Sequence, residues 1–140
     1  MSSTIDMRLM RYLNLFSNIS KVKTLNCFIY NNQIGFAVPE SQVSKAIGKN
    51  ASNVKKLGNI LGKKIKILKM PKEINADSIK EFLEELTGVE GINVEIENDL
   101  VKIGGTRQVK ASLIGRNRAR EKEIQEILAS CFGFKKILIV

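Results

Sequence analysis

The sequence contains an internal repeat, and this repeat limits the possible folds more than any other feature. When residues 12–61 are moved forward by 67 positions, apolar residues fall on apolar residues without a gap. Phe16 then meets Leu83, and Phe36 meets Ile103. Because this spacing persists through helical and extended patterns alike, we predict one folding unit present in two copies.

The repeat sets the domain organisation. Each copy holds about 70 residues, which is near the lower size limit for a core that is stable alone. We predict domains at 1–71 and 72–140, with the boundary in the short, stiff segment Met70-Pro71-Lys72. With 44% apolar and 26% charged residues, the composition is typical of a globular protein.

The cysteines and the N-terminal segment indicate in which cellular compartment the protein resides. Cys27 and Cys131 lie far apart and outside any CxxC motif, so we expect reduced, buried apolar side chains in an intracellular protein. Asp6, Arg8 and Arg11 interrupt the N-terminal segment, which therefore does not resemble a signal peptide. No apolar stretch reaches membrane-spanning length. We expect a cytoplasmic protein that contacts no membrane.

The first copy shows a fixed order of periodicities. Residues from Ile5 to Phe16 follow helical spacing, and Leu25, Cys27 and Ile29 alternate with polar neighbours as in a half-buried strand. The elements predicted after these are an Asn31-Asn32 hairpin turn, a strand at 34–38, a short helix ending at Gly48, a helix capped by Asn50 or Ser52 and ending at Gly62, and a strand at 64–70.

The second copy repeats this order. Asp77 or Ser78 should cap its first helix, Glu81 should complete a capping box, and Gly88 should end the helix. The elements predicted next are strands at 92–97 and 100–104 around an Asn98-Asp99 turn, a short helix capped by Thr106 and ending at Gly115, a longer helix, and a strand at 134–140.

Charge is distributed in blocks. The chain carries a net charge of +9, and residues 41–72 contain nine lysines and no acid. Residues 73–99 contain nine acids and one lysine, and residues 100–140 contain nine basic residues and three acids. One basic run is usually a solvated helix face. Two basic blocks at equivalent places in two repeats favour a polyanion as partner.

Each basic block surrounds a glycine turn. The segment Ile47-Gly48-Lys49-Asn50 of the first copy recurs as Ile114-Gly115-Arg116-Asn117 in the second. A glycine lets a phosphate approach the backbone closely, the amides at the start of the next helix favour an anion, and the neighbouring cation adds charge. Glycines in such places most often only end helices, so this reading stays open beside the first.

Two helices joined by a glycine-centred turn and followed by a strand resemble the core of a KH domain. Because further elements precede this core, the order is similar to the type II, prokaryotic arrangement. Two such domains in tandem resemble the short archaeal NusA-like transcription factors. The resemblance implies an α+β fold, with the helices of each domain on one face of a small mixed three-stranded sheet. It also implies a protein of transcription termination, antitermination or elongation, with RNA polymerase as a partner by family resemblance alone.

KH domains clamp about four nucleotides of single-stranded RNA with a GxxG loop. The second glycine of that motif is Ala51 in the first copy and Arg118 in the second. We expect Ala51 to keep the first loop open, whereas Arg118 either obstructs the clamp or makes a bidentate phosphate contact. The residues predicted to contact RNA are Lys45, Ile47, Gly48, Lys49, Asn50, Ala51, Lys55, Lys56, Ile114, Gly115, Arg116, Asn117, Arg118 and Arg120.

Catalysis is not predicted, and neither is a cofactor or a metal. The chain has no histidine, which removes the commonest general base and metal ligand. Residues 58–64 are one residue short of a phosphate-binding loop, and Lys64 replaces the hydroxyl that would ligate magnesium. Glu81, Glu84 and Glu85 are expected to cover a solvent-facing side of a helix. With no Trp and few aromatic residues, base stacking is not expected to drive recognition.

Two alternatives remain open. The chain could be an RNA-binding factor for ribosome assembly, since KH pairs also serve in that process. It could instead be a protein-interaction scaffold with degenerate loops, in which an acidic helix around 81–90 docks a basic partner. We expect a monomer in each case.

Overall fold

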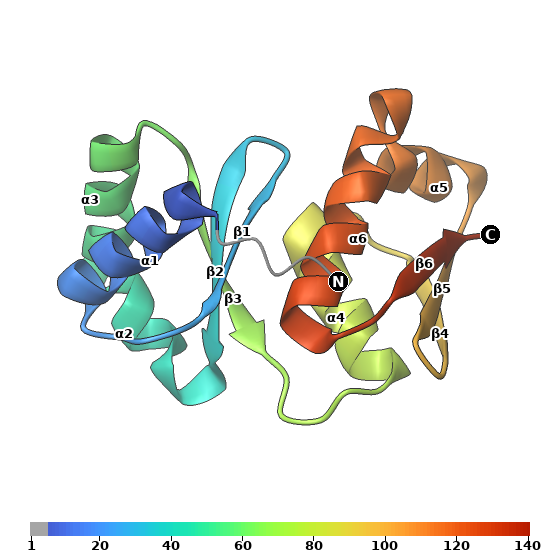
Figure 1. Cartoon of the computed structure of the whole chain (residues 1–140), viewed down its shortest axis with the longest axis horizontal. Coiled ribbons are helices and arrows are strands. Elements are labelled where there is room, and N and C mark those ends of the chain that lie inside the picture. The colour runs from blue at the N-terminus through green and yellow to red at the C-terminus, as the bar shows by residue number, and fades with distance from the viewer. Residues whose placement is uncertain (1–5) are drawn as a thin grey trace. The chain divides into compact units, whose positions relative to one another are not determined.

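The computed structural model describes residues 6–140 and divides into two compact units, Met1–Met70 and Pro71–Val140 (Figure 1). Each unit is described by itself. In the described part of the chain, no helix combines the length and the apolar character needed to cross a membrane.

Both units have the element order helix, strand, strand, helix, helix, strand. The first contains α1 (Met7–Ser20), β1 (Asn26–Tyr30), β2 (Gln33–Pro39), α2 (Val43–Ile47), α3 (Ser52–Leu61) and β3 (Ile65–Met70). The second contains α4 (Ala76–Thr87), β4 (Asn93–Glu97), β5 (Leu100–Gly104), α5 (Arg107–Ile114), α6 (Ala119–Phe132) and β6 (Lys136–Ile139). Short 3-10 turns precede α2, α3 and α6 at Glu40–Gln42, Lys49–Ala51 and Arg116–Arg118. The order of elements and the α+β class are confirmed.

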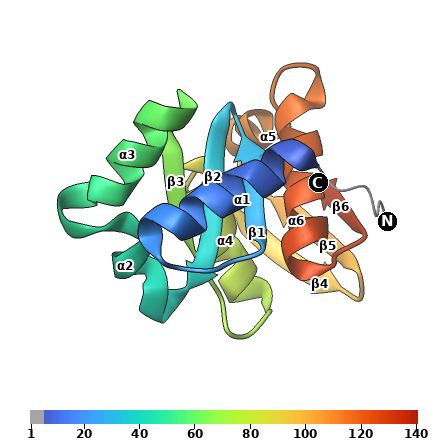
Figure 2. The ribbon, with the colours of Figure 1, turned by 60° about the vertical axis from the view of Figure 1, so that its left-hand side comes forward.

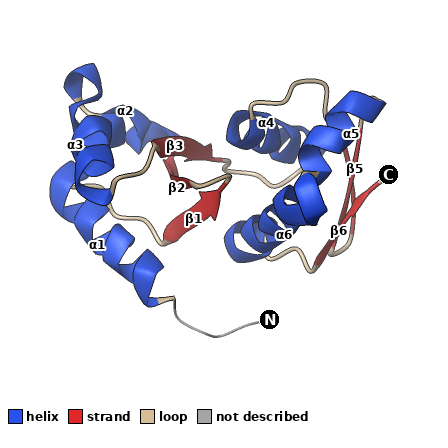
Figure 3. Ribbon diagram, turned by 90° about the horizontal axis from the view of Figure 1, so that it is seen from above, coloured by secondary structure: helices blue, strands red, loops and turns tan. Residues whose placement is uncertain are grey.

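Each unit has one mixed three-stranded sheet (Figure 3). In the first, β2 pairs with β1 antiparallel and with β3 parallel, so that Phe36 lies between Cys27 and Ile67. In the second, β5 has the same two kinds of neighbour, β4 and β6. The parallel pairs require a long crossover, and in each unit that crossover is the pair of helices after the hairpin.

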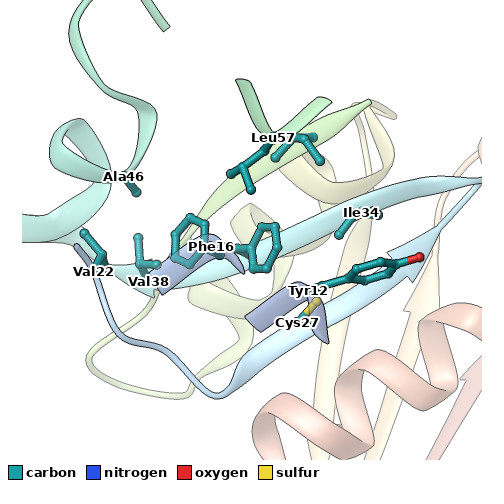
Figure 4. Close-up of a cluster of buried hydrophobic side chains, with 10 residues drawn as sticks. Tyr12, Phe16, Val22, Cys27, Ile34, Val38, Ala46 and Leu57 are labelled. Carbon is teal, nitrogen blue, oxygen red and sulfur yellow. The ribbon is translucent and has the colours of Figure 1, made fainter. Parts of the chain in front are cut away.

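The helices of the first unit cover one face of its sheet, and the core lies between them. Phe16 of α1 stacks on Phe36 of β2, with ring centroids 4.2 Å apart and planes 9° apart. Figure 2 shows α1 crossing the strands, and Figure 4 shows buried side chains of α1 and of the elements that pack against it. Burying a side chain of this size contributes about 1.5–3 kcal/mol. The cluster consists of Tyr12, Phe16, Val22, Cys27, Ile34, Phe36, Val38, Ala46, Leu57 and Ile65.

The second unit has its own buried apolar residues at matching positions. Leu83 and Ile103, which the repeat pairs with Phe16 and Phe36, are both fully buried. Phe82 meets Phe132 edge to face, with ring centroids 5.0 Å apart.

A hydroxyl contact at the end of the first helix also recurs. The Ser20 hydroxyl donates to the carbonyl oxygen of Phe16 (2.7 Å) and accepts from the amide of Val22 (3.1 Å). Thr87 makes the same two contacts at the end of α4, with the same distances. Ser and Thr hydroxyls often compete with the backbone in this way, and here they direct the chain from helix to strand.

The predicted cap of α4 is wrong. Asn75 is the capping residue, because its side chain accepts from the amide of Ser78 (2.8 Å) while the Ser78 hydroxyl accepts from the amide of Asn75 (3.0 Å). The capping box therefore starts two residues before Asp77 and does not use Glu81.

The repeat fails at the entry to the hairpins. Leu25, predicted to face inward, is 90% exposed, whereas its counterpart Ile92 is fully buried. The cause is Thr24, whose hydroxyl donates to Ala37 O (2.6 Å) and accepts from Asn26 N (3.1 Å), so that the chain bends before β1 begins.

Glu84 also departs from its prediction as a solvent-facing acid. Its carboxylate accepts from the amides of Gly91 (2.9 Å) and Ile92 (3.2 Å). It therefore closes the connection between α4 and β4 and has a structural function.

Candidate nucleic-acid interface

The turn between α2 and α3 has an unusual backbone. The amide of Gly48 donates to Ser44 O (3.0 Å) and ends α2, and Gly48 itself has φ +82°. Asn50 and Ala51 follow in the left-handed region, with φ 55° and 59°. The amide of Ala51 then donates back to Gly48 O at 3.1 Å.

The turn between α5 and α6 has the same backbone. Gly115 N donates to Ala111 O (3.0 Å), and Gly115 has φ +72°. Asn117 and Arg118 have φ 55° and 61°, and Arg118 N donates to Gly115 O at 3.2 Å. The recurring sequence motif therefore corresponds to one recurring geometry, although Lys49 is replaced by Arg116 and Ala51, the next residue after the motif, by Arg118.

The space beside each glycine is filled by the following helix. A Cβ atom on Gly48 would lie 2.7 Å from Ser52 Oγ and 2.9 Å from Asn53 Nδ2. A Cβ atom on Gly115 would lie 2.6 Å from Cγ of Arg120. The glycines therefore fit both the positive φ and the side chains beside them, and close approach of a phosphate to this backbone stays a prediction. Both glycines are half-buried, and neither is enclosed.

Ala51 and Arg118 occupy the position of the second glycine of a GxxG loop. Their left-handed backbone is the conformation that glycine adopts freely and other residues adopt at a cost of about 1 kcal/mol. Each loop of this chain therefore keeps the glycine-type backbone without the glycine.

The helices after the two loops lack a side-chain cap, which corrects the prediction for α3. Asn50 lies in the turn before the helix, and Ser52 is already its first helical residue. Among the described residues, no side chain accepts from the first-turn amides of α3 or α6 as a cap. The side chains that cap the other long helices, α1, α4 and α5, are Asp6, Asn75 and Thr106. An uncapped N-terminus presents free amides and the positive end of the helix dipole, which favour an anion.

Four lysines surround the first loop. Lys45, Lys49, Lys55 and Lys56 are exposed, and within residues 6–140 none of them forms an ion pair. Ile47, at the end of α2, is half-buried. In this part of the chain, no carboxylate therefore offsets the charges of these lysines around the uncapped end of α3.

Two arginines, one in the second loop and one at the start of α6, form ion pairs. Arg118 Nε lies 3.3 Å from Glu121 Oε1, and Arg120 Nε lies 3.0 Å from Glu123 Oε1. Arg120, which was predicted to contact RNA, also packs over Gly115. Arg116 and Asn117 are exposed, and Ile114 is half-buried.

Asn53 is absent from the predicted contact residues, yet it holds the first loop together. Its side-chain amide donates to Lys45 O at 3.0 Å and so ties the start of α3 to α2. The internal repeat could have pointed to Asn53, because it corresponds to Arg120, which was among the predicted residues and which covers Gly115.

The cysteines are not reactive groups at this surface. Cys27 lies in the first core. Burial raises the pKa of the Cys131 thiol from 9.0 to about 12, so the thiol stays protonated at neutral pH. Within the described residues, no group of His, Cys, Asp and Glu side chains has an arrangement that could hold a metal ion.

Comparison with known proteins gives three similarities. The profile of the KH domain family matches residues 11–82. A protein of Methanocaldococcus jannaschii, described as a probable transcription termination protein NusA, is 36% identical over 56 residues, which are 40% of this chain and 31% of that protein. The chain thus matches less than a third of that relative's length. The crystal structure of APE1850 superposes with a TM-score of 0.63 and 26% identity, covering 97% of this chain and 100% of that chain.

Proposed function

Because the chain belongs to the KH domain family, we propose that it binds single-stranded RNA at the loop between α2 and α3. The observation that carries this proposal is the uncapped N-terminus of α3 with four exposed lysines around it. The first-turn amides and the charges of Lys49 and Lys55 would bind phosphates, while half-buried Ile47 offers apolar surface to a base.

We further propose that the second unit is a second KH domain and that both are of type II. This proposal is supported by the shared element order, by the shared mixed sheet, and by the equal backbone of the two loops. In each unit, a helix and a strand come before the core, which consists of a strand, two helices and a last strand. An extra helix and strand before the core are the order of the type II arrangement.

A function in transcription is the third part of the proposal. The relative from Methanocaldococcus jannaschii is described as a probable transcription termination protein. By this similarity we propose that the chain acts as a non-enzymatic, cytoplasmic factor on RNA near RNA polymerase. Crosslinking in cells tests this part: nascent transcripts with polymerase are expected as the main targets. Dominant crosslinking to ribosomal RNA precursors would contradict it and favour ribosome assembly.

RNA binding itself is tested by titrating the chain with short single-stranded RNAs of varied sequence, followed by fluorescence anisotropy. Saturable binding at low salt is expected. Failure to bind any oligonucleotide would contradict the proposal and favour a protein-interaction scaffold.

A further inference from the structure

The two units have the same order of elements but very different net charges. Residues 6–70 contain 12 Lys and Arg and two acids, so their net charge is +10. Residues 71–140 contain 11 Lys and Arg and 12 acids, so their net charge is −1. These two values together give the +9 of the whole chain. The excess positive charge therefore belongs entirely to the first unit.

The same difference appears at the loops. Residues 45–56 contain four lysines and no acid. The equivalent residues, 112–123, contain four cations and also Glu121 and Glu123. The repeat pairs Glu123 with Lys56, so a cation of the first copy is replaced by an acid in the second.

The two acids of the second loop lie against its arginines. Glu121 Oε1 is 3.3 Å from Arg118 Nε, and Glu123 Oε1 is 3.0 Å from Arg120 Nε. Both carboxylates and the Arg120 side chain are only 22–25% exposed, whereas Arg118 is 74% exposed, so solvent screens the Arg120–Glu123 pair less than the Arg118–Glu121 pair. A phosphate that approached this loop would compete with these carboxylates for Arg118 and Arg120 and would be repelled by their charge.

Resting on the proposed RNA function, we propose that the two loops contribute unequally. The first loop supplies most of the affinity for RNA. Glu121 and Glu123 offset two of the four cations of the second loop, which leaves residues 112–123 with a net charge of +2 against +4 for residues 45–56. The second loop thus has the backbone of a phosphate clamp with half the net charge of the first loop.

A matched pair of variants tests this inference on the full chain. Lys49→Gln with Lys55→Gln removes two cations from the first loop, and Arg116→Gln with Lys122→Gln removes the equivalent two from the second. Both variants lower the net charge by the same amount, so long-range attraction falls equally. The probe is a short single-stranded RNA, measured by fluorescence anisotropy across a range of salt concentrations.

The first double variant is expected to lose affinity by about tenfold or more, and the second by less than about threefold. Each lost phosphate contact on a single strand lowers the slope of log affinity against log salt by about 0.7, so the first variant should lose about 1.4. Equal losses, or a larger loss in the second variant, would overturn the inference while leaving the proposed RNA function intact. Absence of binding by the unaltered chain would overturn the RNA function and the inference with it.

A reciprocal variant tests the effect of the two acids directly. Glu121→Gln with Glu123→Gln keeps the size of both side chains and frees the charges of Arg118 and Arg120. Affinity for the same RNA is expected to rise by about threefold or more, and this gain should vanish when Arg118→Gln and Arg120→Gln are added. An unchanged affinity in a folded variant would show that the acids do not restrain the loop.

Discussion

The amide nitrogen of Ala51 donates to the carbonyl oxygen of Gly48 at 3.1 Å, and Ala51 is held in the left-handed region by the turn that this bond closes. The loop thus stores backbone strain beside its four lysines. This strain can be tested by measuring the stability of the protein without RNA.

Replacing Ala51 by Gly should stabilise the protein by about 1 kcal/mol, because glycine adopts φ 59° without the cost that alanine incurs. Thermal and urea unfolding measure the effect, and a rise of several degrees in melting temperature is expected. Ala46→Gly is the matched control: Ala46 lies inside α2, so the same change should destabilise there. A loss of stability in Ala51→Gly would show that the loop is not strained.

Replacing Asn75 by Ala should destabilise the second unit by about 1 kcal/mol, because α4 loses the acceptor for the Ser78 amide. Asp77→Ala is the control, since Asp77 is exposed and is not the cap of this helix. Urea unfolding separates the two. A larger loss for Asp77→Ala would favour the cap predicted from sequence over the observed one.

Cys131 should resist alkylation. Its pKa is raised by burial to about 12, so at pH 8 the folded protein holds far less thiolate than the unfolded chain. Iodoacetamide should therefore modify Cys131 about a hundredfold more slowly in the native protein than in urea, as measured by peptide mass spectrometry. Because burial penalises the thiolate, Cys131 should leave the stability of the fold unaffected below pH 9 and lower it as the pH rises from 9 toward 12. Native and unfolded rates that agree would contradict the buried thiol.

Affinity for RNA should fall steeply with salt, because phosphates that bind the lysines of the first loop release counterions. Three or four contacts on a single strand correspond to a slope of about −2 to −3 in log affinity against log salt. Isothermal titrations between low and physiological salt measure it. A flat dependence would mean that the charges around α3 do not contact RNA.

Sequence patterns predicted what depends on local periodicity. Apolar spacing predicted the two copies and the order of their elements. Glycine often ends a helix because it adopts a positive φ freely, so the glycines that end α2 and α5 could be predicted as well. The left-handed Asn31 and Asn32 likewise belong to the predicted hairpin turn.

The wrong predictions from sequence concern side-chain contacts that depend on the three-dimensional path of the chain. Asn75, Asp77 and Ser78 are all able to cap a helix, and the path of the chain decides among them. Leu25 points outward because of a bond from Thr24 to the neighbouring strand. The ion pairs of the second loop depend on side-chain directions at the start of α6. Composition alone therefore did not show that Arg118 and Arg120 are paired with Glu121 and Glu123.

The most direct test of the central claim replaces Lys49 and Asn50 by Asp and measures the dissociation constant for a short single-stranded RNA. Both residues are exposed, and Asp tolerates the left-handed backbone of Asn50, so the melting temperature should remain nearly unchanged. The first-loop account predicts that affinity falls at least about tenfold, since attraction to phosphate becomes repulsion. An unaltered affinity in the folded variant would contradict it.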